Sequence, residues 1–411
     1  MIRKLKVGIL RETKTPPDRR VPLTPDQVRT LMEQNPGVEF FIQSSSFRCF
    51  TDNDYRVYGL PIREDLSDCD ILMGIKEVDK RTLISGKTYI FFAHVGKKQA
   101  YNREMFREMA SKNDSLIDYE YLTTDIGQRV IAFGRWAGII GAYNGLRAVG
   151  LKSGRFKLKP AHQSCDLNEM WHGLGAADLK PGTKILVTGG GRVSSGAIET
   201  LKICRISQVD PRDFLSREYD IPVFCKIGPE HYTVHRSGHH FDMSHFIRQP
   251  EEYGSAFFPY ARVTDVLITG HYWDPCSPVF LSKEDMKSPD FRIRVIADIS
   301  CDINGPVPST IRSSSISDPF YDFNPHLEKE EPAFSNPDSI TVMAVDNLPG
   351  ELPRDASHDF GNQLIQNLLH DLFSGTESPM IQRATILKDG KLTSVFNYLN
   401  DYLYDATPQP P

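Results

Sequence analysis

A lysine and a histidine that each follow an apolar stretch are the residues best suited to acid/base chemistry. Lys76, with Glu77 beside it, ends the stretch 70–76, and His94 ends the stretch 88–94. Both stretches are predicted to be strands of an α/β sheet, in which functional side chains gather at the carboxyl ends of neighbouring strands. Such a pair could act as acid and base if burial or a cationic neighbour tunes the lysine, with Glu77 and Glu120 balancing the charge. The same residues also fit separate polar strand ends at the surface.

Three arginines close to strand or helix ends are candidates for binding carboxylates: Arg11, Arg20 and Arg129. The planar guanidinium group binds a carboxylate through two parallel hydrogen bonds. Taken singly, an arginine in such a position is more often an ordinary surface residue.

A glycine-rich segment is typical of a dinucleotide-binding loop. It follows the predicted strand 183–188 and precedes a helix-forming stretch, so its backbone N–H groups could approach a pyrophosphate at the positive end of a helix. Ser194 stands where the third glycine of the GxGxxG pattern is expected, and a tight turn without a ligand stays an alternative. The loop residues that we expect to contact the cofactor are Gly189, Gly190, Gly191, Arg192 and Val193.

Acidic residues beyond the loop are candidates for the rest of the cofactor site. The acid that binds a ribose is expected about 20 residues after the glycines, which indicates Asp210. Asp210 also fits the start of a helix, so NAD and NADP both stay open. Asp298 and Asp302 lie at the end of the predicted strand 293–298, where Asp302 could orient a substrate or water, or cap a turn.

A histidine-rich segment carries no common metal-binding motif. Its histidines are His231, His235, His239, His240 and His245. The segment contains neither an HExxH pattern nor paired cysteines. This spacing favours a solvated loop, and we predict no metal site.

Strands alternate with helical stretches along most of the 411 residues. This order predicts α/β domains with mostly parallel sheets, and the length predicts two or three domains. Small residues cluster over 134–145, at the end of a helix-forming stretch that could run between domains. The segment 205–260 is expected to be an insertion or an elaborated edge of the sheet. Leu364, Ile365, Leu368 and Leu369 form an apolar helical stripe that we expect to pack on the first domain. The predicted strands are 5–10, 38–42, 70–76, 88–94, 115–120, 183–188, 265–269, 293–298 and 340–345.

Composition excludes several classes of protein. Lys and Arg total 48 against 53 Asp and Glu, a net charge of -5, so no basic excess indicates nucleic acid or an anionic membrane as partner. The seven cysteines are an odd number and form no CxxC, which favours a reducing compartment, and we expect a cytoplasmic protein. No stretch resembles a signal peptide or a membrane span.

Several segments, taken in order, resemble the alanine dehydrogenase / transhydrogenase / saccharopine dehydrogenase superfamily. The segment 74–77 is similar to the strand of the family's catalytic lysine, and 92–99 resembles the saccharopine dehydrogenase form of the histidine segment. The altered glycine pattern at Ser194 and the expected insertion depart from the family pattern. The matching segments are 11–14, 20–25, 74–77, 92–99, 118–122, 129–138, 297–302 and 345–357.

The resemblance implies two Rossmann-like α/β domains with a cleft between them, the first discontinuous in sequence. Residues 1–135 and 350–411 would form the substrate and catalytic domain, and 136–349 the dinucleotide-binding domain. The cofactor would be NAD, with NADP not excluded. By motif match, the catalytic residues would be Lys76, His94, Glu77 and Glu120, the substrate-binding residues Arg11, Arg20 and Arg129, and further cofactor-binding residues Asp298, Asp302, Asn347 and Leu348.

The implied activity is an amino acid oxidoreductase of the saccharopine dehydrogenase type. It would oxidise a secondary amine to an imine that is hydrolysed to lysine and 2-oxoglutarate, reversibly. One alternative is an alanine dehydrogenase-like imino-acid reductase, against which the segment 92–99 argues. Another is a dinucleotide-binding protein without turnover. The expected partners are small amino acid and oxo acid substrates.

Overall fold

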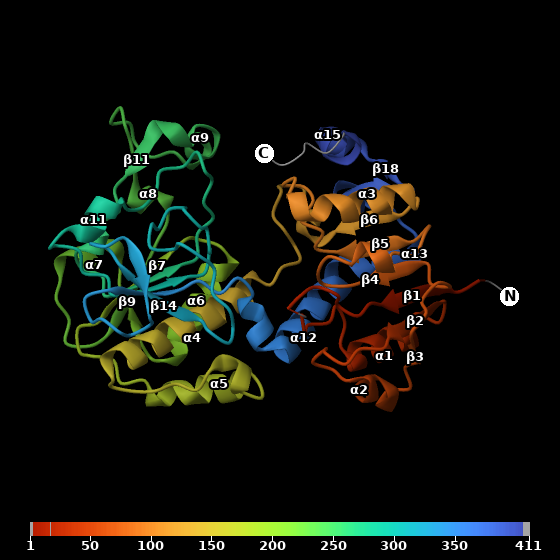
Figure 1. Cartoon of the computed structure of the whole chain (residues 1–411), viewed down its shortest axis with the longest axis horizontal. Coiled ribbons are helices and arrows are strands. Elements are labelled where there is room, and N and C mark those ends of the chain that lie inside the picture. The colour runs from red at the N-terminus through yellow and green to blue at the C-terminus, as the bar shows by residue number, and fades with distance from the viewer. Residues whose placement is uncertain (1–2, 17, 406–411) are drawn as a thin grey trace. The chain divides into compact units, whose positions relative to one another are not determined.

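The computed structural model describes residues 3–16 and 18–405 and divides into two compact units (Figure 1). Unit 1 comprises Met1–Ala132 together with Pro353–Pro411, and unit 2 comprises Phe133–Leu352. Each unit is built on an eight-stranded, mostly parallel sheet. The prediction of two Rossmann-like units, the first discontinuous in sequence, is thereby confirmed.

The sheet of unit 1 has the strand order β18-β17-β6-β5-β4-β1-β2-β3. The strands β1 to β6 run parallel, and their apolar side chains are buried because helices cover the sheet. The C-terminal strand β17 pairs antiparallel with β6, and β18 with β17. The strands are β1 (Leu5–Ile9), β2 (Val38–Gln43), β3 (Ile62–Arg63), β4 (Ile71–Met73), β5 (Thr88–Phe91), β6 (Ser115–Asp118), β17 (Thr385–Lys388) and β18 (Lys391–Leu392).

The helices of unit 1 begin and end where the sequence provides caps. Thr24 is the N-cap of α1, its backbone N–H donating to the Gln27 carboxamide oxygen at 3.0 Å. In the C-terminal segment Leu364, Leu368 and Leu369 are buried within this unit, as the apolar stripe predicts. The helices are α1 (Pro25–Gln34), α2 (Asp52–Val57), α3 (Arg103–Ser111), α12 (Pro353–Leu364), α13 (His370–Ser374), α14 (Pro379–Ala384) and α15 (Asn400–Tyr404), with a π-helical turn over Ile365–Leu369.

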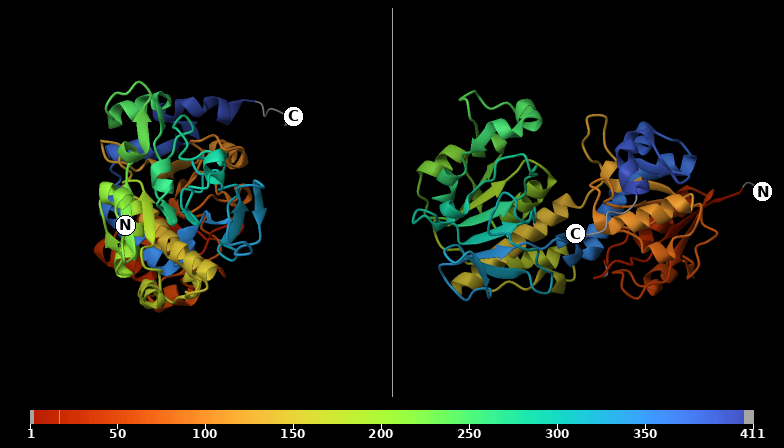
Figure 2. Two further views of the ribbon diagram at one scale, coloured as in Figure 1. Left: turned by 90° about the vertical axis from the view of Figure 1, so that its left-hand side faces the viewer. Right: turned by 45° about the horizontal axis from the view of Figure 1, so that its top comes forward.

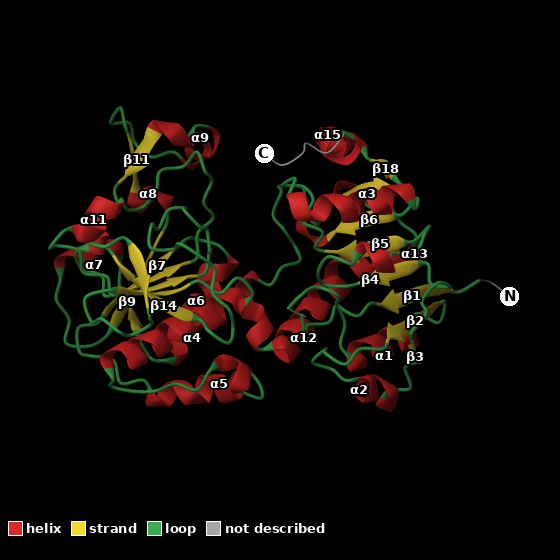
Figure 3. Ribbon diagram, viewed as in Figure 1, coloured by secondary structure: helices red, strands yellow, loops and turns green. Residues whose placement is uncertain are grey.

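The sheet of unit 2 has the strand order β15-β14-β16-β13-β12-β7-β9-β8. Strands are drawn in yellow in Figure 3, where β7, β9 and β14 of this sheet are labelled. Six of its strands are parallel, and β14 and β15 extend one edge in antiparallel fashion. The strands are β7 (Lys184–Thr188), β8 (Ser207–Gln208), β9 (Val223–Ile227), β12 (Val266–Thr269), β13 (Val295–Asp298), β14 (Phe320–Asn324), β15 (Lys329–Glu331) and β16 (Ile340–Met343).

The segment 205–260, predicted to be an insertion or an elaborated edge, belongs in part to this sheet. Strand β9 pairs with β7 over five positions, from Lys184↔Val223 to Thr188↔Ile227, and β8 pairs with β9. Strands this short, one of them carrying Lys226, show too little periodicity to be recognised. A separate antiparallel hairpin, β10 (Thr233–His235) with β11 (Tyr253–Ser255), is joined to neither large sheet (Figure 2). The segment therefore forms one edge of the sheet and adds a separate hairpin.

The small residues of 134–145 begin a helix of unit 2 rather than ending one. Helix α4 packs along α6 so closely that a Cβ at Gly138 would lie 1.8 Å from the Val193 carbonyl oxygen, and one at Gly196 would lie 2.0 Å from that of Arg135. Glycine is needed there because only its backbone permits this approach. The helices of unit 2 are α4 (Gly134–Ser153), α5 (Leu167–Gly173), α6 (Arg192–Ile203), α7 (Pro211–Ser216), α8 (Pro229–Tyr232), α9 (Met243–Arg248), α10 (Phe258–Ala261) and α11 (Lys283–Lys287).

None of the helices within 3–16 and 18–405 combines the length and the apolar character that crossing a bilayer requires.

Candidate active site and cofactor loop

Two neighbouring parallel strands bring Lys76 and His94 to the same edge of the unit 1 sheet. Strand β4 pairs with β5 from Ile71↔Thr88 to Met73↔Ile90. The segments that follow the two strands stay side by side, since the Phe92 N–H donates to the Ile75 carbonyl at 3.0 Å. Lys76 follows β4 and His94 follows β5, as expected for functional groups at the carboxyl ends of parallel strands.

Glu77 connects the two strand ends. Its Oε1 lies 2.8 Å from His94 Nδ1, its Oε2 lies 3.4 Å from Lys14 Nζ, and Asn102 donates to Oε1 at 3.3 Å. The Glu77 side chain is only 9% exposed. Burial opposes its ionisation, but the hydrogen bond and the charge of His94 outweigh burial and lower the pKa of Glu77 to about 2. Glu77 is therefore a buried carboxylate that holds the imidazole by Nδ1.

The backbone at His94 adopts a left-handed conformation that is uncommon for residues other than glycine. Its φ is 52°, a conformation that persists only where the surroundings hold it. The preceding residue, Ala93, is held through both of its backbone polar groups. Asn102 donates to the Ala93 carbonyl at 2.9 Å, and the Ala93 N–H donates to Asp118 at 3.1 Å. Burial raises the pKa of Asp118. The imidazole is thus positioned by its backbone as well as by Glu77.

Lys76 lies in surroundings that favour its neutral form. Burial lowers its pKa, and the charges of Arg20 and Lys14 lower it further, while Asp18 and Glu77 act in the opposite direction. A lysine of lowered pKa is in its neutral, proton-accepting form more often than an ordinary surface lysine at the same pH.

Two carboxylates that the sequence analysis missed shape the same site. Glu12 accepts hydrogen bonds from the N–H groups of Ile75 at 2.7 Å and Lys76 at 2.9 Å, so it fixes the backbone of the lysine. Burial, assisted by the charge of Asp18, raises the pKa of Glu12 to about 8. Asp18 forms a buried ion pair with Arg20. Glu12 comes directly after the predicted first strand, which is the signal that could have identified it.

The three predicted arginines have three different partners. Arg20 is buried and bonded to Asp18, with Nε 3.0 Å from Oδ1. Arg129 Nη2 lies 2.6 Å from Glu120 Oε1, with 41% of the arginine side chain exposed. Arg11 pairs with Glu64 at 2.9 Å and donates to the Ser44 carbonyl. Of these three arginines, Arg20 is the one whose charge lowers the pKa of Lys76. Arg129 keeps a partly exposed guanidinium group next to Glu120.

The glycine loop of unit 2 has the shape that a pyrophosphate requires. It lies between β7 and α6, and Gly191 is the N-cap of that helix. Gly189 has a φ of 98°, and a Cβ there would lie 2.5 Å from the Gly270 carbonyl oxygen. A Cβ at Gly190 or Gly191 would meet nothing within 4 Å, so these two backbones are open to a ligand at the positive end of α6. The residues present therefore fit a dinucleotide.

A buried histidine next to this loop carries an unused hydrogen-bond donor. The Gly270 N–H donates to Thr188 Oγ1 at 3.3 Å, and that hydroxyl lies 2.8 Å from His271 Nδ1. Because the hydroxyl oxygen already accepts from Gly270, we assign its proton to the contact with Nδ1, which leaves the proton of the neutral ring on Nε2. Burial lowers the pKa of His271 to about 4, and Nε2 has no hydrogen-bond partner among the described residues. His271 was not predicted from the sequence.

The predicted ribose-binding acid occupies a different position from the one expected. Asp210 is exposed and caps α7, accepting from the N–H groups of Arg212 and Asp213 at 3.0 Å. It follows β8, whereas the strand next to β7 is β9, whose Ile227 carbonyl accepts from the Gly189 N–H at 2.8 Å. The first carboxylate after β9 is Glu230, which folds back over Gly228. We therefore take Glu230, in place of Asp210, as the candidate for the acid that binds the ribose. The elements β8 and α7 lengthen the usual spacing between the glycine loop and this acid.

The remaining predicted cofactor residues differ in how accessible they are. Asp298 is fully buried and accepts hydrogen bonds from the hydroxyls of Thr269, Ser300 and Thr310 at 2.5–2.6 Å, so its carboxylate organises the ends of β12 and β13. Leu348 is buried against Gly141 of α4. The residues at the loop and helix ends are partly or fully exposed: Gly190, Gly191, Arg192, Val193, Asp302 and Asn347.

Comparison with known proteins shows which proteins this chain resembles. Residues 8–140 match the family model described as alanine dehydrogenase/PNT, N-terminal domain. A saccharopine dehydrogenase [NAD(+), L-lysine-forming] from Candida glabrata is 29% identical over 91% of this chain and 93% of its own length. The chain is a homologue of the saccharopine dehydrogenases. The resemblance stated from the sequence motifs is thereby confirmed.

Two further proteins define the extent of the likeness. The alpha-aminoadipic semialdehyde synthase of Arabidopsis thaliana is 30% identical to this saccharopine dehydrogenase homologue over 96% of the chain. The chain spans only 41% of that relative's length. A solved L-alanine dehydrogenase shares the fold, with a TM-score of 0.62 at 16% identity, covering 97% of this chain and 100% of that one.

Proposed function

We propose that this protein is a nicotinamide-dependent oxidoreductase that acts on the carbon–nitrogen bond of a saccharopine-like amino acid. The observation that carries the proposal is the arrangement at the ends of β4 and β5. A lysine of lowered pKa and a histidine held through Nδ1 by a buried carboxylate are the groups that amine oxidation and imine hydrolysis need. A dinucleotide-binding protein without turnover would have no use for them.

The proposed reaction requires several proton movements that Lys76 and His94 can provide. A bound nicotinamide cofactor would supply the acceptor for the hydride that leaves carbon. The proton that leaves nitrogen can be taken up by the neutral form of Lys76. Hydrolysis of the imine then needs a proton removed from the attacking water and another given to the departing amine of lysine. His94, with Nδ1 held by Glu77, offers Nε2 for this exchange.

The substrate side of the proposal rests on the arginines. Saccharopine and 2-oxoglutarate carry more carboxylates than alanine or pyruvate. Arg129, partly exposed beside Glu120, can bind such a carboxylate through its guanidinium group. Arg20 is already bonded to buried Asp18, so we assign it to lowering the pKa of Lys76 in addition to any contact with substrate.

The cofactor side rests on unit 2. The backbones of Gly190 and Gly191 would hold the pyrophosphate, and His271 Nε2–H would donate to an acceptor oxygen of the cofactor. A carboxylate at the position of Glu230 accepts from ribose hydroxyls and repels a 2′-phosphate, so we propose NAD as the cofactor. Glu230→Gln should weaken NADH binding and leave NADPH binding unchanged or stronger in a fluorescence titration.

Absorbance of NADH and NADPH tests the proposal directly. Lysine with 2-oxoglutarate should oxidise the cofactor, whereas ammonia with pyruvate should not. Turnover of ammonia with pyruvate alone would support an alanine dehydrogenase-like imino-acid reductase. Binding of NADH without turnover of any amine and oxo acid pair would contradict an enzymatic role.

A further inference from the structure

The hairpin outside the large sheets is small and has no disulfide to hold it. Strands β10 and β11 pair over three positions, from Thr233↔Ser255 to His235↔Tyr253, and a short helix, α9, lies between them in sequence. A two-stranded hairpin is marginally stable in water by itself. Small elements of this kind are often stabilised by a disulfide or a metal ion, and every cysteine of the chain is free.

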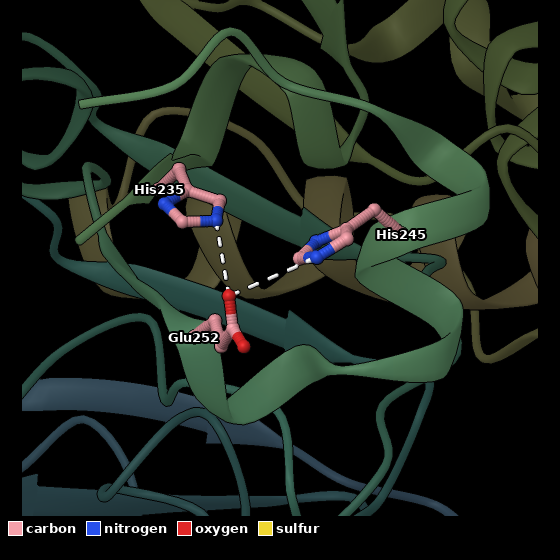
Figure 4. Close-up of side chains that lie close together, drawn as sticks. All are labelled: His235, His245 and Glu252. Carbon is pink, nitrogen blue, oxygen red and sulfur yellow. Dashed lines mark ion pairs between the residues drawn. The ribbon is translucent and has the colours of Figure 1, made fainter. Parts of the chain in front are cut away.

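Three potential metal ligands meet inside this hairpin (Figure 4). His235 comes from β10, His245 from α9, and Glu252 from the residue before β11. Glu252 Oε2 lies 3.2 Å from His235 Nε2 and 3.7 Å from His245 Nε2. One ligand atom from each residue lies within 4.8 Å of the others. His235 is buried, at 7% exposure, which is low for a histidine of a solvated loop.

The protonation of His245 is set by its neighbours in a way that suits a ligand. The Tyr253 hydroxyl donates to the Asp242 carbonyl at 3.3 Å, so its oxygen accepts from His245 Nδ1–H at 3.2 Å. In the neutral ring the lone pair of Nε2 then faces the Glu252 carboxylate. Two lone pairs face each other favourably only when a proton or a metal ion lies between them. Metal-bound histidines typically donate their second ring N–H in this manner.

In the absence of metal, a proton on His235 faces the Glu252 carboxylate. The exposed Ser237 N–H donates to His235 Nδ1 at 3.1 Å, so the neutral ring carries its proton on Nε2 and donates it to Glu252. Coordination at Nε2 requires that this proton move to Nδ1. The Ser237 N–H then loses its acceptor on His235 and donates to water instead. The exchange leaves the charge of the ring unchanged and exposes no buried group.

We propose that His235, His245 and Glu252 form a structural binding site for a zinc-class divalent cation. Imidazole nitrogens and a carboxylate oxygen are ligands that Zn²⁺ accepts in tetrahedral geometry. His239, whose ring centre lies 4.8 Å from that of His235, or a water molecule would complete the fourth position. The ion would join β10, α9 and the start of β11, and so hold the hairpin in one shape.

Metal binding to the full-length protein tests this site. After removal of metal with a chelator, the wild type should bind one equivalent of Zn²⁺, measured with a competing zinc indicator. His245→Gln and Glu252→Gln should each weaken Zn²⁺ binding at least ~10-fold, and Tyr253→Phe, which frees the His245 ring, should weaken it by a similar factor. The matched control is His240→Gln, an exposed histidine of the same segment outside the cluster, which should bind Zn²⁺ like the wild type.

A second readout guards against variants that merely misfold. Zn²⁺ should slow proteolysis within 236–250 in the wild type and in His240→Gln, but not in Glu252→Gln. Co²⁺ should give the absorption of a tetrahedral complex in the wild type and in His240→Gln, in which the cluster is intact, but not in Glu252→Gln. Failure of the wild type to bind Zn²⁺ or Co²⁺ would overturn the proposal. Equal loss of binding in His240→Gln and His245→Gln would overturn it as well, since the ion would then be held by surface histidines without a defined site.

Discussion

Glu77 Oε1 lies 2.8 Å from His94 Nδ1, and this contact makes the two strand ends a single unit. The carboxylate fixes which nitrogen of the imidazole remains available, and its charge also acts on Lys76 one residue earlier. A change at Glu77 must therefore affect both proposed acid/base groups at once.

Replacing either acid/base residue should lower turnover without preventing cofactor binding. General acid/base groups contribute about 10²- to 10⁴-fold to rate, so Lys76→Met and His94→Gln should each reduce kcat by a factor in that range. NADH affinity should stay unchanged, because the glycine loop belongs to the other unit. Near wild-type turnover in both variants, on every substrate pair that the wild type uses, would remove these residues from the mechanism.

The pH dependence of oxidation should shift in opposite directions in two variants. If Lys76 acts as base, kcat rises with pH as Lys76 loses its proton. Lys14→Met removes a positive charge that lowers the Lys76 pKa, so this limb should move to higher pH. Glu77→Gln removes a negative charge that raises that pKa, so the limb should move to lower pH. The control is Lys4→Met. Lys4 lies just before the first strand and pairs with Glu39, so this variant should leave the pH profile unchanged.

Stability in acid should depend on Glu77. Its pKa is lowered from 4.5 to about 2, so its contribution is present above pH 4.5 and is lost as the pH falls toward 2. A shift of this size corresponds to about 3 kcal/mol. The difference in unfolding free energy between the wild type and Glu77→Gln, measured in urea, should therefore shrink between pH 6 and pH 3. A difference that stays constant over this range would show that the carboxylate is not ionised as proposed.

Arg129 should matter for a dicarboxylic oxo acid. Loss of a hydrogen bond to a charged group costs about 1.5–3 kcal/mol, so Arg129→Ala should raise the KM for 2-oxoglutarate roughly 10- to 100-fold. Arg81→Ala provides the control, because Arg81 pairs with Asp79 on the surface with 82% of its side chain exposed. An unchanged KM in Arg129→Ala would leave the substrate carboxylates without the partner that we propose.

The glycine loop can be tested without damage to the fold. A Cβ at Gly191 meets no protein atom within 4 Å, so Gly191→Val should fold and should abolish NADH binding by filling the approach to the helix end. Gly175→Val, at another position with open space, should bind NADH normally. Unaltered NADH affinity in Gly191→Val, measured by fluorescence titration, would show that the loop is only a turn.

The strand ends were predictable because they depend on local pattern. Short apolar runs followed by polar residues located Lys76 and His94, and parallel pairing of β4 with β5 placed them on one edge. Glu12 and Asp18 were missed because their roles depend on burial and on contacts that form only in the folded chain. The one sign that the sequence offers is the place of Glu12 just after the first predicted strand. His271 was missed for the same reason.

Spacing rules failed where the chain departs from the usual order of strands. Asp210 has the expected distance from the glycines, but β8 and α7 occupy that length of chain and β9 comes later. The histidines of the hairpin likewise show no metal spacing, since Glu252 reaches His235 only through the antiparallel return of the chain. A ligand contributed by a turn of this kind cannot be read from a linear pattern.

The pairing of β17 with β6 has a consequence for synthesis on the ribosome. Residues 385–388 and 391–392 complete a sheet whose six other strands lie within Leu5–Asp118, so the edge of β6 stays open while all of unit 2 is made. At about 5–20 residues per second, that interval lasts on the order of tens of seconds. An unpaired strand edge is a template for association with other chains. The nascent protein therefore needs protection from aggregation during this interval, and unit 2, contiguous in sequence, is free to fold before unit 1 is finished.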